Sequence, residues 1–291
     1  MRKLLLALVL ICLALGSASA ESRVDCAALH SEILHRELRY CVMLPPDYDR
    51  EAKKKYPVLY FLHGLGEDEQ ALVTSGGWGL IEDLEREGKV GGVLMVAPEG
   101  RDSFYINSAD GRSRYSDFFR TEFLPFIESR YRVLRARGSR GVTGLSMGGY
   151  GALRFAFAYP ELFGSVSAQS PALVTESPRQ LAGLEEGGPL EHLLASIFGD
   201  PVDLAHWNQN NPLRLALKKP AEIRGQKIYF NCGAEDQYGF QDGVKALDKQ
   251  LAGEKIPHEF HLYPGGHDAE YFLSHLGETI EFHWRAFSGG K

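Results

Sequence analysis

Short, almost continuous runs of apolar residues alternate along the chain with segments of mixed polarity. Runs of this kind at 56–62, 91–98 and 227–232 are typical of strands that are buried on both faces of a sheet. Between the second and third runs, apolar residues recur every four positions over 115–131, which predicts an amphipathic helix with a kink at Pro125. The alternation of strands and helices predicts a single α/β domain built on a doubly wound, mostly parallel sheet.

The remaining pattern adds elements at both ends of this sheet. We expect strands at 39–44 and 258–263, and helices at 78–87 and 243–251. The stretch from Thr175 to Trp207 is less periodic and contains several Gly and Pro residues. We interpret it as an insertion that could cap a site at the edge of the sheet.

The N-terminal residues have the pattern of a secretory signal peptide. Arg2 and Lys3 precede an apolar run from Leu4 to Leu15, and small residues follow up to Ala20. The run is shorter than the roughly 20 residues that a transmembrane helix needs. We therefore expect 1–20 to be removed, and 21–291 to form one exported domain, secreted or periplasmic, with no stable membrane insertion after cleavage.

Composition narrows the choice of partners. The chain of 291 residues has 32 Lys and Arg against 38 Asp and Glu, a net charge of −6, and loss of the leader would make it more acidic. This balance argues against nucleic acid or anionic lipid as the ligand. The motifs typical of zinc proteases, paired-cysteine metal sites and nucleotide-binding loops are missing from the sequence, so we expect no metal and no cofactor.

Three cysteines follow the predicted leader. Cys26 and Cys41 flank a predicted hairpin whose turn lies near Leu34, so the two side chains should lie opposite one another and form a disulfide. Cys232 ends an apolar strand, where a buried free thiol is expected.

The most informative motif is the sequence Gly-Leu-Ser-Met-Gly at 144–148. It lies between a predicted strand that ends near Thr143 and a helix with apolar residues at Ala152 and Phe157. Glycines on both sides of Ser146 allow a sharp turn that exposes the hydroxyl, as in a nucleophile elbow.

A serine nucleophile needs a base, and the base needs an acid that orients it. In this kind of fold the chain order is serine, acid, histidine, each in a loop after a strand. Asp236 and His267 satisfy both conditions. The alternatives are other acidic residues of the same loop and other histidines near the C-terminus: Glu235 and Asp242, and His258, His261 and His275.

Backbone amides should stabilise the negative charge that develops on the substrate. Met147 follows the serine at a helix N-terminus, and Leu65 lies in the loop that begins at His63; we expect their N–H groups to form the oxyanion hole. His63 itself should shape this loop rather than act as a base. Aromatic residues in nearby loops and helix starts are candidates for a substrate-binding wall: Trp78, Tyr105, Trp207, Tyr238 and Phe240.

The segments "YPVLYFLHGLGEDE", "MVAPEG", "GLSMGGYGAL", "CGAED" and "PGGHDAEYF" resemble the "putative esterase" group. This group includes esterase D (S-formylglutathione hydrolase), feruloyl and acetyl-xylan esterases, and the antigen 85 mycolyltransferases. The resemblance implies the α/β-hydrolase fold and places Ser146, Asp236, His267, Leu65 and Met147 in the roles given above.

The resulting expectation is a secreted serine carboxylesterase that acts through an acyl-enzyme. Its substrate would be a small acyl or hydroxycinnamoyl ester of a carbohydrate. Two alternatives remain at this point: an acyltransferase of the antigen 85 type with the same triad, and a non-catalytic binding protein on the same fold.

Overall fold

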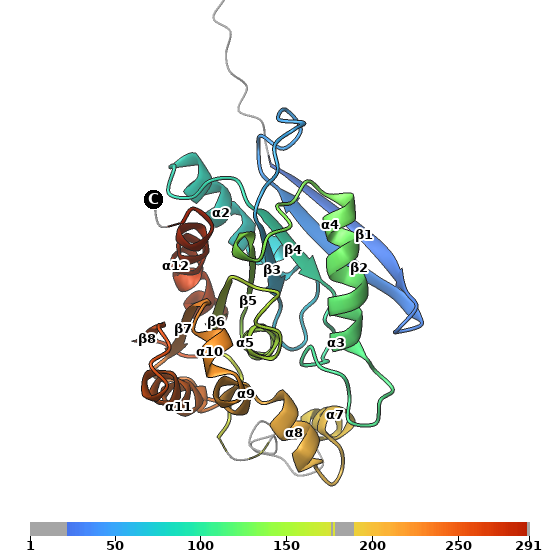
Figure 1. The fold of residues 1–291 in the computed structure, drawn as a ribbon, viewed down its shortest axis with the longest axis vertical. Helices are drawn as coiled ribbons and strands as arrows, with labels where there is room; N and C mark the ends of the chain where they lie inside the picture. Colours follow the sequence, from blue (N-terminus) through green and yellow to red (C-terminus); the bar gives the residue numbers. More distant parts are fainter. Residues whose placement is uncertain (1–21, 176, 178–188, 290–291) are drawn as a thin grey trace, which may run out of the picture.

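The computed structural model describes residues 22–175, 177 and 189–289. Its centre is an eight-stranded sheet in the order β1-β2-β4-β3-β5-β6-β7-β8 (Figure 1). Strands β3 to β8 run parallel to one another, whereas β2 pairs antiparallel with both β4 and β1 at one edge. The strands are β1 Arg23–Ser31, β2 Arg36–Leu44, β3 Val58–Leu62, β4 Leu94–Pro98, β5 Arg140–Gly144, β6 Ser165–Gln169, β7 Lys227–Gly233 and β8 Glu259–Tyr263.

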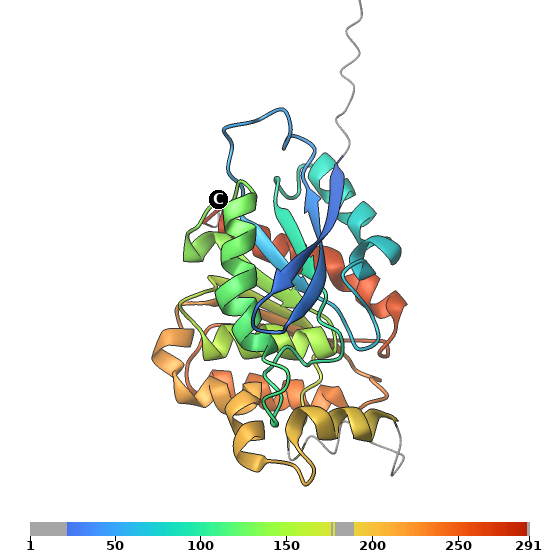
Figure 2. The ribbon, with the colours of Figure 1, turned by 90° about the vertical axis from the view of Figure 1, so that its right-hand side faces the viewer.

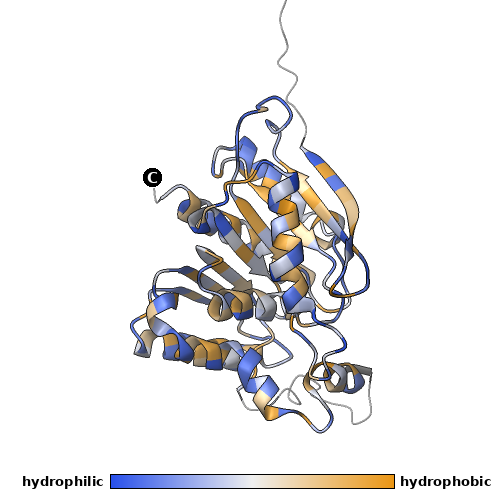
Figure 3. Cartoon of the chain, turned by 45° about the vertical axis from the view of Figure 1, so that its right-hand side comes forward, coloured by the Kyte–Doolittle hydropathy of each residue, from blue (hydrophilic) through white to orange (hydrophobic). Residues whose placement is uncertain are grey.

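Helices cover both faces of the sheet (Figure 2). The described helical segments are α1 Ala71–Thr74, α2 Gly77–Arg86, α3 Tyr115–Phe118, a π-helix Phe119–Phe123, α4 Leu124–Arg130, a 3₁₀-helix Arg137–Ser139, α5 Met147–Ala158, α7 Pro189–Phe198, α8 Leu204–Asn210, α9 Pro212–Lys218, α10 Pro220–Ile223, α11 Phe240–Gly253 and α12 Ala269–Phe287. Hydrophobic residues are concentrated in the central strands, whereas the helices contain both hydrophobic and hydrophilic residues (Figure 3). The prediction of a doubly wound, mostly parallel sheet is confirmed.

Strand β3 shows why its sequence is apolar throughout. Val58, Tyr60 and Leu62 belong to the core that includes α5, whereas Leu59 and Phe61 belong to a second core beneath α2 and α12. Successive side chains of a strand point to opposite faces, and here each face is covered by helices. An alternating polar and apolar pattern would therefore leave polar groups buried on one face.

The helix predicted over 115–131 is irregular at a different place from the one expected. The chain forms α3, then the π-helical turn Phe119–Phe123, and then α4, in which Pro125 occupies the first turn. Proline lacks an amide hydrogen and its ring clashes with the carbonyl four residues earlier. The π-helical turn lies directly before α4 and so changes the hydrogen-bonding pattern just upstream of Pro125; the kink at Pro125 stays a prediction.

The predicted insertion is partly helical. Its described residues include α7 and the first half of α8, while residue 176 and residues 178–188 lie outside the described part of the chain. Trp207 of α8 is buried, stacks on Tyr150 of α5 and meets Phe198 of α7 edge to face. The described residues of the insertion are thus part of the core that supports α5.

The edge hairpin of β1 and β2 contains the predicted disulfide. Cys26 and Cys41 are register partners, and their sulfur atoms are bonded, which confirms the pairing. Cys232 is free and buried, as expected. The predicted leader, residues 1–20, lies outside the described residues. No helix in the described part of the chain has the length and apolar character to cross a membrane.

The disulfide should contribute measurably to stability. It closes a loop with a sequence separation of 15, for which the chain-entropy model gives about 3 kcal/mol. We expect reductant to lower the free energy of unfolding by about this amount, measured by urea denaturation. The double variant Cys26→Ala/Cys41→Ala should be equally destabilised and insensitive to reductant. Free thiols at both positions in protein from an oxidising compartment would contradict this prediction.

Candidate active site

Ser146 lies at the turn between β5 and α5, in a backbone conformation that a serine rarely adopts. Its φ is 54° and its ψ is −119°, which costs on the order of 1–3 kcal/mol. Two hydrogen bonds to the end of β6 and the segment after it hold this conformation: Ser146 N–H donates to the Gln169 carbonyl at 2.9 Å, and Ala172 N–H donates to the Ser146 carbonyl at 3.0 Å. The neighbouring strand therefore maintains the strained turn.

The glycines of the motif are required by close packing. A Cβ atom at Gly148 would lie 1.8 Å from the Leu62 carbonyl oxygen of β3, and one at Gly144 would lie 2.4 Å from the Gly148 backbone. Both distances are far below van der Waals contact. The start of α5 can approach β3 this closely only with glycine at these positions, as the motif predicted.

The side chains of Ser146, His267 and Asp236 form one hydrogen-bonded chain. His267 Nε2 is 2.9 Å from Ser146 Oγ, and His267 Nδ1 is 2.8 Å from Asp236 Oδ2. An ionised carboxylate only accepts hydrogen bonds, so Nδ1 carries the proton and Nε2 is free to accept one from the serine. The structure brings together the three residues that sequence order singled out.

Asp236 is enclosed by hydrogen-bond donors. It is 3% exposed, and its Oδ1 accepts the Tyr238 N–H at 2.9 Å while the Cys232 thiol points to Oδ2 at 3.6 Å. Burial raises the pKa of Cys232 to about 12, so the thiol keeps its proton. These donors stabilise the ionised carboxylate that His267 needs as a partner.

The alternative residues have other partners. Glu235 accepts the Gly265 N–H at 2.6 Å, and Asp242 faces Lys245 at 3.7 Å. His258 contacts Asp248 at 2.9 Å. The rings of His261 and His275 stack against Tyr263.

A pocket of about 250 Å³ opens beside Ser146 and His267. Three aromatic rings meet the His267 imidazole edge to face, those of Tyr238, Phe240 and Phe272, with centroids 5.0–5.3 Å away. The remaining lining residues are mostly apolar: Gly64, Leu65, Glu67, Phe104, Leu145, Met147 and Ala172. The pocket thus combines an apolar wall with one polar side on which the serine and histidine lie.

The backbone N–H groups of Leu65 and Met147, which were expected to form the oxyanion hole, lie at this pocket and have no hydrogen-bond acceptor among the described residues. The neighbours of Leu65 are engaged, because Gly64 N–H donates to Glu67 Oε2 at 2.7 Å and Gly66 N–H donates to Asp102 Oδ1 at 2.9 Å. Strands β3 and β5 are neighbours in the sheet, so both amides belong to loops that leave adjacent strand ends. They are available to a negatively charged oxygen.

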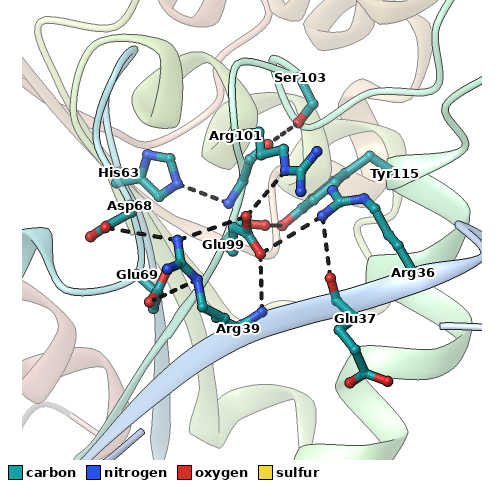
Figure 4. A network of polar contacts seen from close by, with 11 residues as sticks. Arg36, Glu37, Arg39, His63, Asp68, Glu69, Glu99, Arg101, Ser103 and Tyr115 are labelled. Carbon is teal, nitrogen blue, oxygen red and sulfur yellow. Dashed lines mark hydrogen bonds and ion pairs between the residues drawn. The ribbon is translucent and has the colours of Figure 1, made fainter. Parts of the chain in front are cut away.

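His63 is fixed in one neutral tautomer. Its Nε2 accepts the Gly100 N–H at 2.8 Å, so Nδ1 carries the proton and donates to the Gly64 carbonyl at 2.8 Å (Figure 4). Burial lowers the pKa of His63 below its ordinary value. With both ring nitrogens occupied by backbone groups, His63 shapes the loop and has no free nitrogen with which to act as a base.

Comparison with known proteins assigns the family. A sequence profile described as "Putative esterase" matches residues 31–282. The chain belongs to this esterase family. The chain is 32% identical over 250 residues to esterase Rv1288 of Mycobacterium tuberculosis, covering 78% of this chain and 51% of that protein, so it spans about half the length of this relative. An acetyl esterase of Caldicellulosiruptor saccharolyticus is 26% identical over 87% of this chain and 95% of its own.

The fold is shared with solved esterase structures. A ferulic acid esterase superposes with a TM-score of 0.78 and 28% identity, over 92% of this chain and 99% of that one. The α/β-hydrolase fold that the resemblance implied is thereby confirmed, as is the resemblance to the esterase group itself.

Three of the aromatic residues expected to contact a substrate lie elsewhere in the structure. Trp78 packs in the core beneath α2 and donates to Ser22 Oγ at 3.1 Å. Trp207 is buried between α5 and α7. Tyr105 is fully buried, and its hydroxyl donates to the His63 carbonyl at 2.9 Å. These predictions were wrong because large aromatic side chains near strand ends also serve as core packing; Tyr238 and Phe240 do line the pocket.

The sequence analysis also missed two aromatic lining residues, Phe104 and Phe272. Phe272 lies in the first turn of α12, five positions after His267, on the helix that the histidine loop leads into. Its spacing from His267 was a usable signal. Phe104 has a φ of 50° in a loop without apolar periodicity, and no pattern in the sequence predicts where its ring points.

The fold should not tolerate a side chain at Gly148. We expect Gly148→Ala to lower the melting temperature strongly or to prevent folding, because its Cβ would overlap the Leu62 carbonyl. Gly79→Ala is the matched control: it lies inside α2, with nothing within 4 Å of the added methyl group. This control should leave stability unchanged or raise it by about 0.5–1 kcal/mol. Equal melting temperatures for the two variants would contradict the packing argument.

Proposed function

We propose that this protein is a secreted serine carboxylesterase that works through an acyl-enzyme. The observation that carries the proposal is the continuous hydrogen-bonded chain from Ser146 through His267 to buried Asp236 at the edge of a pocket. His267 Nε2 accepts the serine proton as Oγ attacks the ester carbonyl. Asp236 holds the imidazole in the required tautomer and stabilises the imidazolium.

The negative charge of the tetrahedral intermediate would be stabilised by the N–H groups of Leu65 and Met147. Met147 is the first residue of α5, so the helix dipole adds to its effect. When the intermediate collapses, His267 gives its proton to the leaving alcohol and the acyl group stays on Ser146. Water, activated by the same histidine, then releases the acid and restores the serine.

The pocket supports a small or flat acyl group. Its volume of about 250 Å³ is slightly below the range of roughly 300–1,000 Å³ common for small-molecule sites. The rings of Phe104, Tyr238, Phe240 and Phe272 provide aromatic surface against which a hydroxycinnamoyl ring can pack. The names of the relatives, an acetyl esterase and a ferulic acid esterase, agree with this size and chemistry. We infer that the alcohol part of the ester is a carbohydrate.

Hydrolysis is favoured over transfer to another alcohol by the exposure of the pocket. Leu65 is 40% exposed and Tyr238 is 53% exposed, so water reaches the wall beside Ser146. An acyltransferase of the antigen 85 type must keep water away from its acyl-enzyme. The Cys26–Cys41 disulfide supports export, because disulfides persist in oxidising compartments.

An ester panel with product analysis tests this proposal. We expect release of free acid from p-nitrophenyl acetate, methyl ferulate and a feruloylated or acetylated oligosaccharide, with hydrolysis dominant even with excess trehalose as acceptor. Ser146→Ala should fold normally, lose about 10⁵–10⁶ in kcat and no longer react with a fluorophosphonate. Mainly transfer product, or activity confined to long-chain esters, would contradict the proposal. No hydrolysis and no labelling of the unsubstituted protein would favour a non-catalytic binding protein.

Asp236 can be distinguished from its neighbour by matched amide variants. We expect Asp236→Asn to lower kcat by about 10⁴, because an asparagine amide at this position favours the wrong tautomer of His267. Glu235→Gln should change kcat by less than tenfold, since Glu235 contacts only the loop backbone at Gly265. Steady-state kinetics on p-nitrophenyl acetate measure both. A severe loss in Glu235→Gln together with a mild one in Asp236→Asn would reverse the assignment.

A further inference from the structure

The loop that carries Leu65 is attached to a second loop, 99–105, by side chains and backbone groups. Gly100 N–H donates to His63 Nε2 at 2.8 Å, and the Tyr105 hydroxyl donates to the His63 carbonyl at 2.9 Å. Asp102 Oδ1 accepts the Gly66 N–H at 2.9 Å. The position of the Leu65 N–H therefore depends on where the 99–105 loop lies.

Glu99 determines where that loop leaves the sheet. Continuing the register of β2 and β4 by one position beyond Tyr40 and Pro98 places Arg39 opposite Glu99. In the hydrogen-bonded kind of antiparallel pair, the two residues exchange two backbone hydrogen bonds. Here Glu99 N–H donates to the Arg39 carbonyl at 2.8 Å, but Arg39 N–H donates to the Glu99 side chain, Oε2, at 3.0 Å. The Glu99 carbonyl turns away and accepts the Tyr115 hydroxyl at 3.1 Å. The chain thus leaves the sheet at Glu99, and the next amide, that of Gly100, reaches His63.

The Arg39 guanidinium links Glu99 to Asp68 and Glu69, at the C-terminal end of the loop that carries Leu65 (Figure 4). Its Nε is 3.3 Å from Glu69 Oε1, and its terminal nitrogen is 3.9 Å from Glu99 Oε1 and 3.9 Å from Asp68 Oδ2. The side chains of Glu69 and Glu99 are only 3% and 10% exposed. Burial alone would raise the pKa of Glu99, yet the Arg39 N–H and the Arg101 guanidinium hold it below its ordinary value, so this carboxylate is charged.

We propose that Arg39 is a positioning residue for the oxyanion hole, because it holds Glu69 and Glu99 together and so fixes the 63–69 loop at both ends. The proposal rests on the function proposed above, in which Leu65 N–H stabilises the oxyanion. Arg39 lies on β2, in the hairpin at the edge of the sheet, and does not line the pocket. Removal of Arg39 would leave the buried Glu69 carboxylate without its cation. Glu99 would keep Arg101 at 3.1 Å and Arg36 at 3.7 Å, so the change would break the link between the two loops and leave the Glu99 end in place.

Three variants test this proposal. Arg39→Gln removes the cation, and Arg39→Lys keeps a single charge without the planar fork that reaches several carboxylates. Arg23→Gln is the matched control, because Arg23 lies in the same hairpin, is 50% exposed against 56% for Arg39, and contacts Asp25 and Asp49 at 2.8 and 2.9 Å. For each variant, kcat and KM are measured on p-nitrophenyl acetate, and the affinity for phenylboronic acid is measured by inhibition. The fraction of molecules with a reactive active site is measured by fluorophosphonate titration.

We expect Arg39→Gln to lower kcat per titrated site by about 10- to 100-fold with little change in KM, because a misplaced donor weakens stabilisation of the transition state alone. Phenylboronic acid, whose adduct with serine is tetrahedral and anionic, should lose affinity by a similar factor. Arg39→Lys should recover part of both losses, and Arg23→Gln should match the unsubstituted protein. If Arg39→Gln does not fold, the proposal is tested with Arg39→Lys by the same two measurements, kcat per titrated site and affinity for phenylboronic acid.

Three outcomes distinguish failure of the Arg39 proposal from failure of the proposed function. Normal hydrolysis by the unsubstituted protein, with unchanged kcat per site and boronate affinity in the folded Arg39 variants, would overturn the role of Arg39 alone. A lower fraction of titratable sites with normal kcat per site would also overturn it, since that result indicates a purely structural role. Failure of the unsubstituted protein to hydrolyse esters or to react with the fluorophosphonate would overturn the proposed function, and with it this proposal.

Discussion

The left-handed backbone of Ser146 is the constraint on which the rest of the site depends. A serine at φ 54° is stable only where its surroundings hold it, and here the hydrogen bonds to Gln169 and Ala172 do so from the next strand. The turn also requires β3 to lie against the start of α5, with no room for a side chain at Gly148. The exposure of the Ser146 hydroxyl therefore depends on the order of the strands at the centre of the sheet.

The polar groups around this turn are arranged in two shells. The inner shell consists of the His267 ring, oriented by Asp236 and enclosed by aromatic edges. In the outer shell, buried carboxylates and arginines at the ends of β2 and β4 hold the loop that presents Leu65 (Figure 4). Aromatic packing limits the motion of the imidazole, while the outer shell fixes backbone amides that cannot be positioned by their own side chains. Such preorganised groups act without reorganisation during the reaction.

Much of the fold could be predicted from the sequence because its signals are local. The apolar runs of β3, β4 and β7, the hairpin with Cys26 and Cys41, and the glycines around Ser146 each have one dominant physical cause. Chain order likewise selected Asp236 and His267, which the structure brings to Ser146. The aromatic residues were harder, because a tryptophan such as Trp207 has the same sequence signal in a core as in a pocket.

The contacts of Arg39 were not predictable for a different reason. They depend on how β2 pairs with β4. They also depend on the Glu99 carboxylate, which takes the place of the Glu99 carbonyl as the acceptor of the Arg39 N–H. Neither is encoded in periodicity. Likewise, the apolar spacing over 115–131 predicts a helix but carries no signal for the π-helical turn Phe119–Phe123 within it.

The most direct test of the proposed site is a crystal structure of the protein after reaction with a fluorophosphonate. The account predicts a covalent bond between phosphorus and Ser146 Oγ, with the phosphonyl oxygen about 3 Å from the backbone nitrogens of both Leu65 and Met147. His267 should remain hydrogen-bonded to Asp236. Attachment at another residue, or a phosphonyl oxygen that points into solvent away from these two amides, would contradict it.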